Sequence, residues 1–125
     1  MRSFSLCLGA LGLVLVLSTA ASAADAAKPT TVVEAMAPFK PIAEDTLKLI
    51  KAGDIPAAKA KITELETAWD KAEADLKPKY PAEWKSIDKT IDKALDDARK
   101  PEKPDVAKAA ASVQDVVAKL TKPSR

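Results

Sequence analysis

Apolar residues recur at alternating steps of three and four through the middle of the chain, between residues 54 and 99. Residues with this spacing share one side of a helix and form a seam for packing. The first of two such seams contains Ile55, Ala58, Ile62, Leu65, Trp69, Ala72 and Leu76. The second contains Trp84, Ile87, Ile91, Ala94, Leu95 and Ala98. Because Pro78 and Pro81 interrupt the chain between the seams, the pattern predicts a helical hairpin.

The same spacing predicts one more helix on each side of this hairpin. The earlier seam is Val32, Met36, Phe39, Ala43, Leu47 and Ile50. The later seam is Val106, Ala110, Val113, Val117 and Leu120. No segment shows the period-two alternation of a half-buried strand. Since short connections make consecutive helices antiparallel, we predict an all-α fold for residues 30–125: an up-and-down antiparallel bundle of four helices.

Glycine and proline residues indicate where these helices begin and end. Gly53 is expected to end the first helix in a left-handed conformation, and Asp54 to cap the second. Pro81 can open the third helix, because proline suits the first turn. Two alternatives remain for the first helix, which either starts near Thr30 and bends or becomes regular only at Pro38 or Pro41, after a looser turn. We favour the second alternative.

The amino-terminal residues have the pattern of a secretory signal peptide. Arg2 precedes an uncharged apolar run over residues 6–17, and Ala21-Ser22-Ala23 has the small-x-small pattern of a cleavage site. We therefore expect residues 1–23 to be removed and residues 24–29 to form a flexible tether. The apolar run is shorter than the roughly 20 residues of a membrane span. The sequence thus predicts a periplasmic or secreted protein with no stable membrane span after cleavage.

The predicted mature chain contains neither cysteine nor histidine, since the only cysteine is Cys7 in the leader. This composition excludes disulfides, metal sites built from thiolate or imidazole, covalent c-type haem and catalysis by His or Cys. The chain has 20 lysines and arginines against 18 carboxylates, with the signs interspersed. We therefore expect no nucleic-acid partner. Motifs for phosphate loops, nucleophile elbows and zinc-binding helices are also absent, so we assign no catalytic, cofactor-binding or metal residue.

One group in the hairpin is a candidate ligand or packing cluster. Its members are Trp69, Asp70, Trp84, Asp88 and Asp92. Both tryptophans occupy seam positions, which favours core packing, whereas a stacking platform for a ligand would need both rings exposed. Asp88 lies at the edge of the apolar face, so its carboxylate is expected to need a lysine or a tryptophan N–H as partner.

Aspartates recur every four residues along the third predicted helix, at Asp88, Asp92 and Asp96. Such a stripe is either an oxygen-ligand site for a hard cation such as calcium or a solvated helix face. Lysines interleave with it at Lys85, Lys89 and Lys93, and Lys93 is spaced to pair with Asp97. Because these lysines would neutralise a cation site, we favour the solvated face.

Three strings in the hairpin carry a resemblance. They are Leu65-Glu66-Thr67-Ala68-Trp69-Asp70, Pro81-Ala82-Glu83-Trp84, and Ile87-Asp88 with Ile91-Asp92-Lys93-Ala94-Leu95. Together they resemble a pattern in small secreted bacterial helical-bundle proteins that have no established activity. The resemblance covers about half of the mature chain and implies an exported helical bundle, but no catalytic or ligand residues.

These observations favour an exported, non-enzymatic binding or interaction module that needs no cofactor. Its partner is an unknown protein or a small ligand, and a wide apolar face would also allow a homodimer. One alternative is a cation-responsive sensor or buffer that uses the aspartate stripe. Another is a small hydrolase or lyase that depends on carboxylates.

Overall fold

The computed structural model describes residues 31–123, so the predicted signal peptide and tether lie outside the described residues. Four long helices follow a short one: α1 (Val32–Met36), α2 (Lys40–Lys51), α3 (Ile55–Leu76), α4 (Pro81–Ala98) and α5 (Val106–Thr121). A 3₁₀ turn, η1 (Ala37–Phe39), joins α1 to α2. No strand occurs in this part of the chain, and the prediction of an all-α bundle is confirmed.

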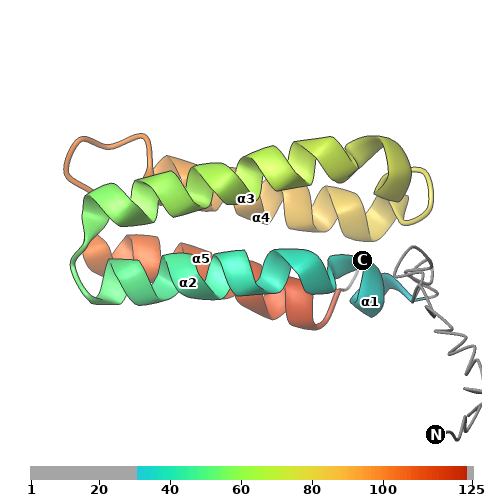
Figure 1. The fold of residues 1–125 in the computed structure, drawn as a ribbon, viewed down its shortest axis with the longest axis horizontal. Coiled ribbons are helices and arrows are strands. Elements are labelled where there is room, and N and C mark those ends of the chain that lie inside the picture. The colour runs from blue at the N-terminus through green and yellow to red at the C-terminus, as the bar shows by residue number, and fades with distance from the viewer. Residues whose placement is uncertain (1–30, 124–125) are drawn as a thin grey trace, which may run out of the picture.

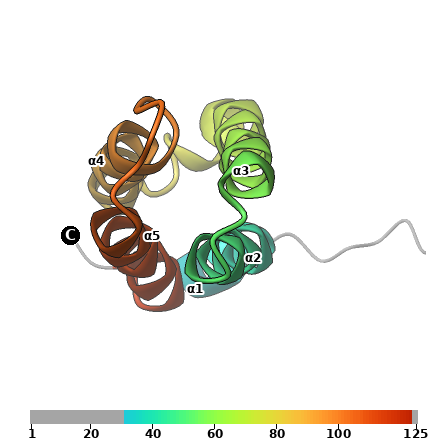
Figure 2. The same cartoon turned by 90° about the vertical axis from the view of Figure 1, so that its left-hand side faces the viewer.

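The four long helices lie side by side and enclose one core (Figures 1 and 2). Viewed from one end, α2, α3, α4 and α5 occupy the four corners of the bundle (Figure 2). Helices α2 and α4 each contact both α3 and α5. The chain doubles back at each of the three connections between them (Figure 1). None of the helices within residues 31–123 is long and apolar enough to cross a membrane.

The first helical segment bends instead of starting with a loose turn. Thr31 and Glu34 form a capping box in which each side chain accepts a hydrogen bond from the other's backbone N–H, at 3.2 and 3.1 Å. Pro38 lies in η1, and α2 begins at Lys40 with Pro41 in its first turn. The regular helix therefore begins close to the predicted position, but the segment ahead of it is already helical.

The other predicted helix ends agree with the structure. Gly53 has a φ of 78°, the left-handed conformation expected after α2. The Asp54 carboxylate accepts a hydrogen bond from the Ala57 N–H at 3.2 Å and so caps α3. Pro81 is the first residue of α4. Asp105, for which no role was predicted, caps α5 through the Lys108 N–H at 3.0 Å.

The buried face of α5 differs from the predicted seam. Val106, the first seam residue, is 43% exposed, and Ala110 and Val117 are only half-buried. The buried residues of this helix are Ala109, Ser112, Val113, Val116 and Leu120. This face is rotated by about 60° from the predicted one, at about 100° per helical residue. The rotation turns Ser112 into the bundle, because α5 packs against both α2 and α4.

Candidate functional site

The two tryptophans of the candidate cluster pack on each other inside the bundle. Trp69 of α3 and Trp84 of α4 are 2% and 3% exposed, and their rings stack with centroids 3.7 Å apart at 11°. Phe39 of η1 meets the edge of Trp69, with centroids 5.2 Å apart at 74°. A ligand on the surface therefore cannot stack on either ring without displacing part of the core.

Asp88 completes this aromatic cluster. The Trp69 Nε1–H donates a hydrogen bond to Asp88 Oδ1 at 2.9 Å, and Asp88 is half-buried. The expected partner of this carboxylate is thus a tryptophan N–H from the neighbouring helix. The bond lets the polar edge of a buried indole reach an acceptor at the surface of the core.

We expect Asp88→Ala to lower the free energy of unfolding by about 1–3 kcal/mol, because it leaves the buried Trp69 N–H without an acceptor. Urea denaturation measures the change. Asp88→Asn retains a side-chain oxygen at this place and should lose less. Asp92→Ala, one turn along the same helix, is the surface control. If all three variants have the same stability, the Trp69–Asp88 bond contributes nothing.

The remaining members of the predicted cluster do not join this group. Asp70 and Asp92 are exposed and form no hydrogen bond or ion pair with a described residue. Partial desolvation, together with the neighbouring charges of Asp88 and Asp96, raises the pKa of Asp92 above its ordinary value. The structure therefore brings together Trp69, Trp84 and Asp88 but leaves the other two carboxylates in solvent.

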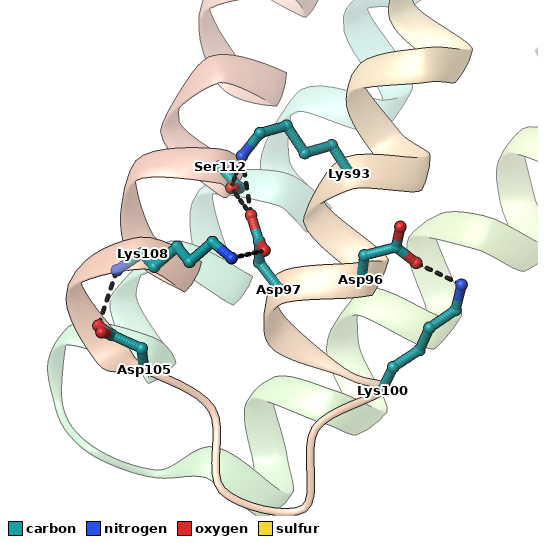
Figure 3. Close-up of polar contacts among 7 residues, drawn as sticks. All are labelled: Lys93, Asp96, Asp97, Lys100, Asp105, Lys108 and Ser112. Atoms are coloured by element: carbon teal, nitrogen blue, oxygen red, sulfur yellow. Dashed lines mark hydrogen bonds and ion pairs between the residues drawn. The ribbon is translucent and has the colours of Figure 1, made fainter.

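The aspartate stripe on α4 is divided among separate partners. Asp88 accepts from Trp69, Asp96 pairs with Lys100, and Asp97 lies on the α5 side of the helix (Figure 3). Within residues 31–123, no group of three or more cysteines or carboxylates is placed to hold a metal ion.

Asp97 is the centre of a polar cluster at the α4–α5 junction (Figure 3). Its side chain is 8% exposed, and Lys93 and Lys108 donate to its two oxygens at 2.8 and 3.1 Å. The hydroxyl of Ser112, which is buried in α5, donates to the same carboxylate and accepts from Lys93 Nζ at 2.7 Å. Hydrogen bonds from Lys93, Ser112 and Lys108 hold the pKa of Asp97 well below its ordinary value. The sequence predicted the Lys93–Asp97 pair but not the contribution of α5.

Beside this cluster, α4 and α5 enclose two adjoining hollows of about 560 and 420 Å³. Both hollows are lined by Lys89, Thr90 and Lys119, so they form one continuous depression, which we call the lysine groove. The charged residues that line it are Lys85, Lys89, Lys93, Lys119, Lys122 and Asp115. Small side chains form the rest of its lining: Ala82, Ser86, Thr90 and Ala118.

Most ammonium groups of the lysine groove have no carboxylate partner. Lys93 is paired with Asp97, and Lys119 donates to the neutral hydroxyl of Ser86 at 2.6 Å. Lys85, Lys89, Lys119 and Lys122 form no ion pair with a described residue. Four uncompensated ammonium groups therefore surround a depression that contains one carboxylate, Asp115. Sequence reasoning treated Lys85, Lys89 and Lys93 only as neutralising charges, because it could not place them beside α5.

A third hollow, of about 380 Å³, lies between η1 and the end of α3. Its lining is mostly apolar and carries one charge of each sign, Asp75 and Lys79. The lysine groove therefore differs from this hollow in both size and charge balance.

Comparison with known proteins finds no family model, no curated protein and no solved structure that matches this chain. The resemblance to small secreted bacterial bundles stays a prediction. Any functional assignment for this chain consequently depends on the geometry of its surface.

Proposed function

We propose that this protein is an exported, non-enzymatic binding module that holds an anionic partner in the lysine groove. The observation that carries the proposal is the group of four ammonium charges without carboxylate partners around one depression. The complete chain is nearly neutral, with a formal net charge of +2, so this surface is a local concentration of positive charge. The leader-like pattern of residues 1–23 supports the export part of the proposal.

Several lysines elsewhere in the bundle have their positive charge compensated by a nearby carboxylate. Lys40, Lys61 and Lys77 pair with glutamates three or four residues away on the same helix or at its end. Lys89 has Asp92 three residues later in the chain, but the two side chains form no ion pair. An anion that enters the groove would supply the missing counter-charges in a concave site.

The side chains that line the groove are better suited to binding an anion than to catalysis. Carboxylate-based hydrolysis uses two acidic groups that flank the substrate, whereas Asp115 is the single carboxylate in the lining. The lining residues come from two packed helices and the residue after α5, so the groove is held by a rigid scaffold.

The proposal requires only that the partner is an anion, so retention on sulfated dextran at low ionic strength tests it. We expect the purified protein to be retained, and Lys89→Glu combined with Lys119→Glu to weaken binding at least about tenfold, since each exposed ion pair contributes up to about 1 kcal/mol. Lys71→Glu, an exposed lysine on α3, is the matched control. Equal losses in the groove variant and the control would show that binding is unrelated to the groove.

A further inference from the structure

Resting on the proposed function, we propose that the partner is a linear chain of phosphate groups that occupies both hollows of the lysine groove at once. Three features of the groove support this partner: its length, the chemistry of its cations and the side chains that its lining lacks.

The groove is long compared with a single small anion. Along α4 it extends from Ala82 to Lys93, which is about 16 Å at about 1.5 Å per helical residue. Lys85 lines only the smaller hollow and Lys122 only the larger one, while Lys89 and Lys119 line both. One phosphate ion can contact the two ammonium groups that both hollows share, Lys89 and Lys119, but only an extended anion can also contact Lys85 and Lys122. The distribution of positive charge therefore matches a chain with repeated negative groups.

The cations of the groove are all lysines. An ammonium group is a compact charge with three donors, and it binds phosphate as a point charge, without the planar two-pronged geometry that an arginine provides for carboxylates and phosphates. Lys85 and Lys89 are one turn apart on α4, a rise of about 6 Å, so neighbouring ammonium groups can contact successive groups of a flexible chain. The Lys119 ammonium is held beside Ser86 on the opposite helix, at 2.6 Å, which places a charge across the groove.

The lining also disfavours two other kinds of polyanion. It contains no aromatic side chain on which a nucleic-acid base could stack. The described part of the chain has no strand, so it offers no sheet edge for main-chain pairing with an extended acidic peptide. A phosphate chain needs neither feature, because its recognition depends on charge and length.

Titration calorimetry with orthophosphate, tripolyphosphate and long-chain inorganic polyphosphate tests the inference on the purified protein. We expect affinity per molecule to rise about twentyfold from orthophosphate to the long chain, as two further ammonium groups are engaged at about fivefold each. The logarithm of the affinity for the long chain should fall with the logarithm of salt concentration with a slope of about −3 for four ammonium groups.

Variants of Lys85 and Lys122, each of which lines one hollow only, test whether the chain occupies both hollows. Lys85→Glu and Lys122→Glu should each weaken long-chain binding at least about fivefold, and each should leave orthophosphate binding nearly unchanged. Lys71→Glu on α3 should change neither. Thermal melting of every variant checks that the bundle remains folded.

The outcomes separate this inference from the proposed function. If the three phosphates bind with similar affinity and their binding depends on Lys89, the inference of a chain that occupies both hollows is wrong, but the proposal of an anion-binding groove remains supported. If polyglutamate or a single-stranded oligonucleotide binds more tightly than polyphosphate, the phosphate chain is again wrong as the partner, and the anion-binding groove remains supported. If neither these anions nor sulfated dextran binds, both proposals are wrong.

Discussion

Replacing Trp84 with alanine is expected to lower the free energy of unfolding by about 3–5 kcal/mol. The side chain is 3% exposed, and its ring stacks on Trp69 with centroids 3.7 Å apart. The substitution removes this contact and leaves a large cavity between α3 and α4, which the remaining side chains fill only in part. Because small domains are stable by only about 5–15 kcal/mol, the variant should be close to unfolding at moderate temperature.

Chemical denaturation followed by circular dichroism measures this loss. Trp84→Phe keeps an aromatic ring at the same place and should lose clearly less than Trp84→Ala. Val33→Ala alters a valine that is 50% exposed on α1 and is the surface control. A loss below about 1 kcal/mol for Trp84→Ala would mean that the stacked pair does not hold α3 against α4, contrary to the core packing described above.

Replacing Asp97 with asparagine should cause the largest loss of stability among single neutralisations of the carboxylates on α4. At neutral pH the carboxylate accepts hydrogen bonds from Lys93, Lys108 and Ser112, and thereby joins α4 to α5. An amide has one acceptor oxygen and no charge, so it cannot satisfy the same three donors. The neighbouring variant Asp96→Asn is the control, since exposed pairs such as Asp96–Lys100 contribute only about 0–1 kcal/mol.

The same residue predicts how stability depends on pH. The pKa of Asp97 is lowered in the folded protein by the hydrogen bonds from Lys93, Ser112 and Lys108, whereas in the unfolded chain it is ordinary, about 3.9. At pH values between the lowered pKa of the folded protein and the ordinary pKa of the unfolded chain, the unfolded state binds one more proton than the folded state. Folding stability therefore falls as the pH falls through this window. The contribution is fully present well above about pH 4 and decreases below it.

Urea titrations at a series of pH values from neutral to strongly acidic check this expectation. The difference in stability between the wild-type protein and Asp97→Asn should be constant near neutral pH and should shrink below about pH 4. A difference that does not change with pH would mean that the carboxylate is not held in its charged form by its neighbours.

The helix ends were predictable because single residues with strong backbone preferences determine them. Gly53 adopts the left-handed conformation, Asp54 caps α3, and Pro81 opens α4, and each of these is a local property of the chain. The bend at Pro38 was harder to predict, because proline fits both a 3₁₀ turn and the first turn of a new helix.

The features that could not be predicted from the sequence depend on contacts between helices. Heptad-like spacing places Trp69 level with the residues around Asp88, but it does not determine how the indole rings are oriented. Ser112 is a polar residue whose burial becomes favourable only when Asp97 and Lys93 satisfy its hydroxyl. The lysine groove requires residues of α4 and α5 to be adjacent, which no pattern within one helix indicates.

The position of the two indoles also determines what intrinsic fluorescence can report. Trp69 and Trp84 are the only tryptophans of the chain, and both lie at the α3–α4 contact. Emission from this protein is therefore a local optical reporter of that contact. Detachment of α5 with α3 and α4 still packed would leave the spectrum almost unchanged, so a dye or a spectroscopic label on α5 is needed to observe it.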